Sequence, residues 1–196
     1  MAILKRMKKL FLTLSLLVIV MFTFGQGSEP KAKEKQTNKT STMDYEARIK
    51  ELNLQLPPVS TPKGLYRPLE IVGNLAYLSG HVSALQDGTL IQGKVGSDLD
   101  MDGGKLAARA VGLSLLATLR HELGSLNKVK RVVKLLGMVN ATPDFDKHPY
   151  VINGCSEVMQ EVFGPVNGVG ARSAFGVAGL PGNCAVEIEA IFELED

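Results

Sequence analysis

The chain has 196 residues with 22 basic and 20 acidic side chains, and four of the basic residues lie within the first 25 positions. Beyond residue 25 there are 18 basic and 20 acidic residues, a formal net charge of −2. A mildly acidic chain offers phosphate backbones little to bind, so its composition argues against nucleic-acid recognition. The basic residues between positions 128 and 134 are more typical of a solvated strand edge.

Residues 1–25 have the layout of a secretory signal peptide. Basic residues between Lys5 and Lys9 precede the apolar run Leu10–Phe24, and Gly25 follows it. This run holds about 15 residues, fewer than the roughly 20 that span a bilayer as a helix. We therefore expect cleavage near Gly25, a periplasmic or secreted protein, and no stable membrane association after cleavage.

Residues 26–45 are predicted to form a disordered linker. The stretch Ser28–Thr42 contains one apolar side chain, Ala32, and cannot bury enough surface to offset the entropy of ordering. The remaining residues, 46–196, have the commonest size of a single domain.

Cysteine and histidine usage gives no indication of a metal site. Cys155 and Cys184 lie far apart in the sequence. An oxidising compartment permits a disulfide between them, but two buried thiols are the preferred interpretation for a domain of this size. The three histidines, at positions 81, 121 and 148, show no metal-ligand spacing, so no metal is expected.

The first predicted elements are two antiparallel strands, residues 67–72 and 75–81, joined by the turn Gly73-Asn74. An irregular loop follows over residues 83–96, which contain Asp87-Gly88. Loops on a rigid sheet often carry function.

A long amphipathic helix is predicted from Asp102 to Leu123. Apolar residues recur there at mostly three- and four-residue spacing, and Gly124 provides a typical stop. The following segment, residues 129–139, is rich in β-branched residues and is predicted to be a central strand.

A second helix is predicted from Tyr150 to Phe163, ended by Gly164-Pro165. A strand over residues 172–177 and a turn over residues 180–183 come next. The last strand, residues 185–195, alternates apolar and glutamate residues, so one face is expected to cover the helices. The order hairpin, helix, strand, helix, hairpin predicts an α+β domain with two helices on one side of a mixed sheet.

Arg172 and Glu187 are the main candidates for chemistry. Their distances from the turn at 180–183 predict that they lie roughly opposite one another on consecutive strands. A guanidinium binds a carboxylate with two parallel hydrogen bonds, and a nearby carboxylate can take a proton from water. The pair suits hydrolysis of a small organic acid, although spacing alone favours a simple ion pair on a glutamate-rich strand.

Two stretches near the C-terminus resemble a known signature. The segment Gly170–Pro181, followed by Val186–Ala190, is similar to the C-terminal signature of the RidA (YjgF) reactive intermediate deaminase family. Gly73-Asn74 with Leu78-Ser79-Gly80 resembles the family's N-terminal hairpin, and Asn153 lies where members often carry an asparagine. The resemblance covers roughly residues 57–194.

This resemblance implies a chorismate mutase-like fold and a homotrimer with clefts between neighbouring subunits. It further implies that Arg172 binds the substrate carboxylate and that Glu187 positions or activates the attacking water. The other substrate-binding positions implied are Ser79, Gly80, Tyr66, Asn153 and the main chain of Ala174. The implied reaction adds water to imine or enamine acids such as 2-iminobutanoate, releasing ammonia and a 2-oxo acid with no metal or organic cofactor.

Some positions depart from the family pattern. Ala174 stands where family deaminases often have cysteine, and His81 stands where glutamine often follows the Ser-Gly pair. These departures indicate a less characterised branch whose substrate can differ. His81 itself is a candidate acid or base, but a histidine at a strand end more often hydrogen-bonds a loop.

Two alternatives to a deaminase remain at this point. The first is a non-catalytic module that holds a small carboxylate in the same clefts. The second is a ribonuclease, against which the acidic composition argues.

Overall fold

The computed structural model describes residues 43–196. The predicted signal peptide, residues 1–25, and most of the predicted linker, residues 26–45, lie outside the described residues. The first described helix, α1 (Tyr45–Glu51), begins at the last residue of the range predicted as linker, and Asp44 caps it. In the described part of the chain, no helix is long and apolar enough to cross a membrane.

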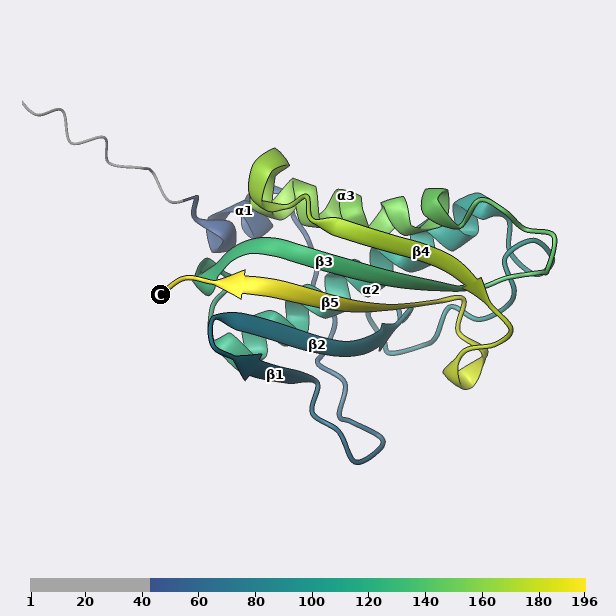
Figure 1. Cartoon of the computed structure of the whole chain (residues 1–196), viewed down its shortest axis with the longest axis horizontal. Coiled ribbons are helices and arrows are strands. Elements are labelled where there is room, and N and C mark those ends of the chain that lie inside the picture. Colours follow the sequence, from purple (N-terminus) through teal and green to yellow (C-terminus); the bar gives the residue numbers. More distant parts are fainter. Residues whose placement is uncertain (1–42) are drawn as a thin grey trace, which may run out of the picture. The chain divides into compact units, whose positions relative to one another are not determined.

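The described residues fold into an α+β domain with a mixed sheet, as predicted (Figure 1). The elements after α1 are the strands β1 (Leu69–Val72), β2 (Leu75–Val82), β3 (Val129–Asn140), β4 (Ala171–Val177) and β5 (Val186–Leu194), the helices α2 (Met101–Leu123) and α3 (His148–Asn167), and the short 3-10 helices η1 (Leu126–Lys128) and η2 (Pro181–Asn183).

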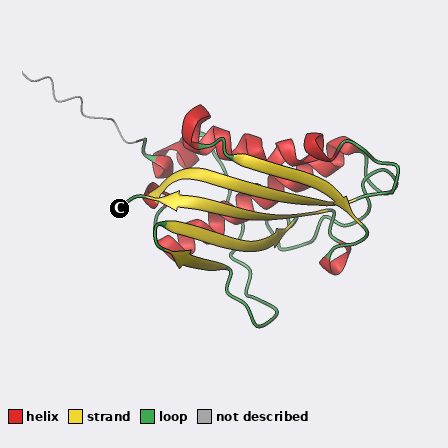
Figure 2. Ribbon diagram, viewed as in Figure 1, coloured by secondary structure: helices red, strands yellow, loops and turns green. Residues whose placement is uncertain are grey.

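The sheet has the strand order β1-β2-β5-β3-β4 (Figure 2). The predicted first hairpin is confirmed, because β1 and β2 pair antiparallel around Gly73 and Asn74. In contrast, β3 and β4 are parallel. The connection through α3 explains this pairing, since parallel neighbours need a crossover that is usually a helix.

The predicted second hairpin is wrong. β5 does not pair with β4 but lies between β2 and β3, antiparallel to both. The turn that contains η2 therefore carries the chain across β3 rather than back along β4. This change of partner alters every contact inferred between residues on β4 and β5.

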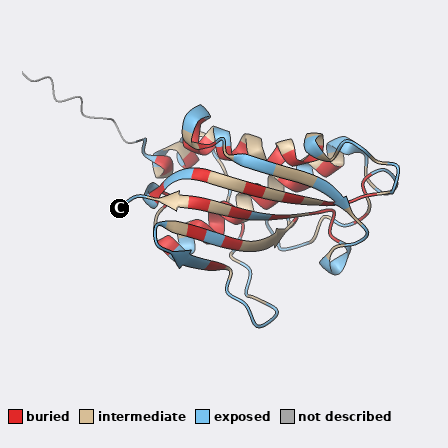
Figure 3. Ribbon diagram, in the orientation of Figure 1, coloured by how far each residue is buried: buried red, intermediate tan, exposed pale blue. Residues whose placement is uncertain are grey.

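Both long helices pack on one face of the sheet, as predicted (Figures 1 and 3). On β5, alternate side chains are fully or almost fully buried on the helix side: Val186, Ile188, Ala190 and Phe192. The intervening residues belong to the other face, which no described helix covers. We call it the open face; its β5 residues are Glu187, Glu189, Ile191 and Glu193.

Glycines with positive φ stand at both predicted helix ends, but only the first of them ends its helix. Gly124 follows α2 in the left-handed conformation, with φ 80°. Gly164 interrupts α3 with φ 82° and ψ 172°, and a short final turn continues to Asn167. The predicted end at Gly164-Pro165 is therefore a kink in α3.

The sequence pattern did not predict α1. Its Tyr45 ring packs edge-to-face on Phe163 with centroids 4.8 Å apart. Glu46 pairs with Arg120 at 2.7 Å and accepts a hydrogen bond from the backbone N–H of Leu126. These contacts hold α1 against the ends of α2 and α3.

Candidate functional site

Apart from Tyr66, the predicted site residues fall into two groups on opposite faces of the sheet. The first group surrounds Arg172 on the edge strand β4. Its register partner is Leu135, which is buried under the helices, so Arg172 projects to the helix side. There its Nη1 donates to Asn153 Oδ1 at 2.7 Å and to Ser156 Oγ at 3.0 Å. We call these three residues the arginine cluster.

The cation of the arginine cluster has no counter-ion in the part of the chain that the structure describes. Within residues 43–196, Arg172 forms no salt bridge, and both hydrogen bonds to α3 use the same nitrogen, Nη1. The residue is exposed. An exposed guanidinium with a fixed Nη1 and further donors available is suited to binding a carboxylate through two parallel hydrogen bonds.

Ala174 extends the arginine cluster along β4. It pairs with Gly137 and packs against the core on the same side of the sheet as Arg172. Its methyl group is only partly buried, and the main chain of β4 connects it to Arg172 two residues before.

The second group lies on the open face around Glu187, whose neighbours in register are Val82 on β2 and Met138 on β3. The pairing of β2 with β5 is irregular between Leu78 and His81. This bulge brings Gly80 under Glu187: a Cβ added at Gly80 would overlap Oε1 and lie 2.9 Å from the carboxyl carbon. We call Ser79, Gly80 and Glu187 the glutamate cluster.

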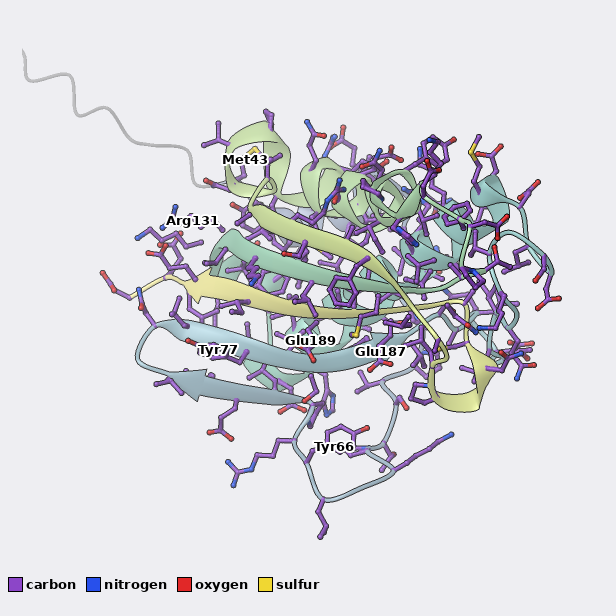
Figure 4. All side chains as sticks on the ribbon, turned by 45° about the vertical axis from the view of Figure 1, so that its right-hand side comes forward. Met43, Tyr66, Tyr77, Arg131, Glu187 and Glu189 are labelled. Carbon is purple, nitrogen blue, oxygen red and sulfur yellow. The ribbon has the colours of Figure 1, made fainter. Side chains whose placement is uncertain are left out.

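The electrostatic environment of Glu187 favours a proton acceptor. Burial raises the pKa of Glu187, and the charge of Glu189 raises it further. Figure 4 shows these two side chains near one another along β5. Within the described residues Glu187 forms no salt bridge, whereas Glu193 farther along the strand pairs with Lys130 and Arg131. A half-buried carboxylate without a cation is typical of a general base.

Ser79 is fixed by the segment before β1. Its hydroxyl donates to the Arg67 carbonyl at 2.6 Å, and its backbone N–H donates to the Pro68 carbonyl at 3.1 Å. It also lines a cavity of about 330 Å³ on the open face, with Tyr77, Lys134, Leu136, Glu189 and Ile191 among the other lining residues. Glu187 is not part of the lining of this cavity.

Tyr66 lies on the projecting loop before β1, where Figure 4 labels it, and its side chain is 52% exposed. Within the described chain it makes no hydrogen bond with either cluster. Its predicted role in the wall of a pocket stays a prediction.

Arg172 and Glu187 do not face one another within a single chain, so the prediction that they lie opposite is wrong. β3 separates their strands, and their partners on β3, Leu135 and Met138, are three positions apart. Because one side chain projects to the helix side and the other to the open face, the simple ion pair is equally ruled out within one protomer.

Sequence reasoning missed Ser156, which shares Nη1 of Arg172 with Asn153. The available signal was its spacing, because positions i and i+3 on a helix lie on the same side. His81 makes hydrogen bonds, as preferred, but to a strand and a helix and not to a loop. Its Nδ1 contacts the Ser79 carbonyl at 2.7 Å, its Nε2 contacts Thr118 Oγ1 at 2.8 Å, and burial lowers its pKa.

The cysteines are free and buried, as preferred from the sequence. Burial raises the pKa of Cys155 to about 12 and that of Cys184 to about 11, so both thiols stay protonated near neutral pH. Among residues 43–196, no group of three or more His, Cys, Asp or Glu side chains could hold a metal ion.

Comparison with known proteins places the chain among relatives with this fold. Residues 46–193 match the family model described as "YjgF/chorismate mutase-like, putative endoribonuclease". Protein TCP17 from Trypanosoma cruzi is 37% identical over 150 residues, which are 76% of this chain and 94% of TCP17.

Solved structures of related proteins have a similar fold. A protein of unknown function from Agrobacterium tumefaciens is 39% identical with a TM-score of 0.70, over 77% of this chain and 94% of that protein. RidA from an Antarctic Psychrobacter species is 28% identical with a TM-score of 0.50, over 71% of this chain and 97% of that RidA.

Proposed function

Because the chain belongs to the YjgF/chorismate mutase-like family that includes RidA, we propose that it hydrolyses small imine and enamine carboxylic acids. The substrates would be of the 2-iminobutanoate and 2-aminoacrylate type, and the products a 2-oxo acid and ammonia. The single observation that carries the proposal is the exposed guanidinium of Arg172, held by Asn153 and Ser156 and free of any carboxylate within the described residues.

We further propose that the working site forms where two protomers of a homotrimer meet. The arginine cluster lies at the edge strand β4 on the helix side, and the glutamate cluster lies on the open face. A ring of three copies, each contacting the next through unlike surfaces, would bring the arginine cluster of one protomer to the glutamate cluster of its neighbour. The apolar residues on the open face support such an assembly, since Tyr77 and Phe175 are 41% and 42% exposed there.

The chemistry follows from these positions. Arg172 binds the carboxylate of the imino acid and orients the imine carbon. The imine reacts in its protonated form: Glu187 accepts a proton from water as the water oxygen bonds to the imine carbon, the carbon–nitrogen π pair moves to the nitrogen, and a neutral tetrahedral aminoalcohol results. The protonated Glu187 returns its proton to the amino nitrogen; the carbon–nitrogen bond then breaks as the hydroxyl oxygen forms the carbonyl of the 2-oxo acid, ammonia leaves, and Glu187 takes up the hydroxyl proton. Ser79 and Gly80 line the position of the imine.

A non-catalytic carboxylate-binding module is the second candidate. The arginine cluster favours it, because Arg172, Asn153 and Ser156 form a complete anion-binding arrangement without Glu187. Under this alternative, Glu187→Gln would leave the binding of 2-oxo acids intact and no imine would be turned over.

A ribonuclease is not favoured by the surface charges. Two of the basic residues near the end of the open face, Lys130 and Arg131, are engaged by Glu193 at 2.7 and 2.5 Å. The carboxylates of Glu187 and Glu189, which form no salt bridge within residues 43–196, would also repel a phosphate backbone.

The signal peptide predicted at residues 1–25 leads us to propose that the protein acts outside the cytoplasm.

The direct test is ammonia release from freshly generated 2-iminobutanoate and 2-aminoacrylate. We expect the parent protein to accelerate release, and Arg172→Ala to lower kcat/KM by at least about 100-fold. Gln160→Ala, on the exposed side of α3, serves as the matched control and should match the parent. Equal rates for Arg172→Ala and the parent would refute the proposed carboxylate clamp.

A further inference from the structure

The strand that carries Arg172 presents a row of positions on its helix side. Arg172, Ala174 and Gly176 alternate along β4, and their partners on β3 all lie on the buried side of that strand. The row therefore runs from the guanidinium, past a methyl group, to a position with no side chain.

His148, the first residue of α3, occupies the space above the end of this row. A Cβ added at Gly176 would overlap Nε2 of His148 and would lie 3.2 Å from each of the two flanking ring carbons. The imidazole also packs edge-to-face on Phe145, with centroids 5.4 Å apart and planes at 80°. A glycine at position 176 is thus what allows the ring to lie against β4.

The imidazole of His148 has hydrogen-bonding capacity that the described residues do not use. Both ring nitrogens of His81 find partners, whereas no hydrogen bond to either ring nitrogen of His148 occurs within residues 43–196. His148 is half-buried. A neutral imidazole can donate from one nitrogen and accept at the other.

The spacing between His148 and the arginine cluster is fixed by regular structure. Along α3, His148 and Asn153 are five residues apart, a rise of about 7.5 Å. Along β4, Arg172 and Gly176 are four residues apart, about 13 Å. A five-carbon dicarboxylate together with one hydrogen bond at each end spans about 12 Å. This length lies between the two estimates, the one along α3 and the one along β4.

We propose that His148 is a specificity-determining residue that selects acids with a second oxygen-bearing group at the end of the side chain. This role for His148 rests on the proposed function, because it takes Arg172 as the residue that binds the first carboxylate. With that carboxylate at Arg172, the chain of the acid lies along Ala174 and its distal oxygen meets the imidazole. The protein then prefers imines related to dicarboxylic amino acids and their amides over the short alkyl imines, which it still accepts.

The test compares the binding of two 2-oxo acids by calorimetry, which needs no catalysis. 2-Oxoglutarate and 2-oxopentanoate have the same chain length and differ in the distal carboxylate. We expect the parent to bind 2-oxoglutarate about tenfold more tightly, and His148→Ala to lose that preference while its affinity for 2-oxopentanoate is unchanged. His148→Gln, which keeps a donor and an acceptor, should retain part of the preference.

Controls separate this inference from the proposed function. His121→Ala, at an exposed position near the end of α2, should keep the preference of the parent. The role of His148 is overturned if the parent binds the two acids with equal affinity. It is also overturned if His148→Ala loses affinity for both acids by the same factor. Arg172→Ala should bind neither acid, and unchanged affinities in that variant would instead overturn the clamp itself. Failure of the parent to bind either acid overturns both.

Discussion

The carboxylate of Glu187 lies directly on the backbone of Gly80, its neighbour across β2 and β5. A Cβ at position 80 would overlap Oε1 and approach the carboxyl carbon to 2.9 Å. The bulge between Leu78 and His81 produces this approach, and the hydrogen bonds of His81 to Ser79 and Thr118 hold the bulge in place. The position of the proposed base therefore depends on a glycine that is not itself reactive.

Gly80→Ala should displace the Glu187 carboxylate and lower kcat for imine hydrolysis by about 100-fold, since a misplacement of about 1 Å can cost that much. The binding of 2-oxo acids should change little. Steady-state kinetics and calorimetry measure the two effects. Gly179→Ala is the control, because a Cβ there meets nothing within 4 Å. An unaltered kcat in Gly80→Ala would show that the position of Glu187 is unimportant.

Asn153 should act through the orientation of Arg172. Asn153→Ala removes one of the two acceptors of Nη1 and should raise KM about tenfold with a smaller effect on kcat. Asn153→Asp should bind carboxylates more weakly still, because the new carboxylate would occupy the guanidinium. The idea fails if Asn153→Asp binds as well as the parent.

The acid limb of the pH profile, where kcat/KM falls at low pH, should reflect the protonation of Glu187. Its pKa is raised by burial first and by Glu189 second, and the base must be ionised, so kcat/KM should fall as pH drops through this raised pKa. Glu189→Gln removes the repelling charge and should move the limb to lower pH. Glu193→Gln should leave the acid limb in place, because the carboxylate of Glu193 is already paired with Lys130 and Arg131. A limb that does not move in Glu189→Gln would argue against Glu187 as the base.

The raised pKa of Glu187 also affects the stability of the protein. The folded state disfavours ionised Glu187, so its contribution to stability is fully present below the ordinary pKa of 4.5 and is lost as pH rises through the raised pKa. Glu187→Gln should therefore have a higher free energy of unfolding than the parent at neutral pH, and the difference should vanish below pH 4.5. Urea titrations at pH 4 and pH 7 measure it, and the opposite sign would contradict the assigned cause.

His81 should make the protein less stable in mild acid. Burial lowers its pKa from 6.5, so the unfolded chain takes up a proton that the folded protein does not. The free energy of unfolding should then fall as pH drops below 6.5 towards the lowered pKa. His81→Gln should flatten this part of the curve, as measured by urea unfolding at pH 7.5 and 5.5. An equally steep curve in His81→Gln would assign the effect to another group.

Local patterns sufficed for most of the fold. The alternation on β5 predicted which of its residues lie under the helices, and Gly73-Asn74 predicted the first hairpin. Gly124 and Gly164 marked positions that need a positive φ, which few other residues adopt. In each case the decisive interaction lies within a few residues along the chain.

The partner of β4 could not be found in that way, because strand order depends on contacts between distant segments. A helix between two strands was the available signal, since it favours a parallel crossover of β3 and β4. The order then puts β5 on the other side of β3, and Arg172 and Glu187 on opposite faces. The sequence resemblance correctly identified the family, but the pairing of these residues within one chain did not follow from it.

In the proposed homotrimer, each site uses Arg172 from one protomer and Glu187 from its neighbour. Arg172→Ala and Glu187→Gln should each be inactive alone. When the two variants are mixed in equal amounts, dissociated and reassembled, a random ring should recover about one quarter of the parental activity, because about one seam in four then pairs an intact arginine with an intact glutamate. Recovery of that size is the result expected; no recovery from demonstrably mixed trimers, or a protein that stays monomeric, would contradict the account.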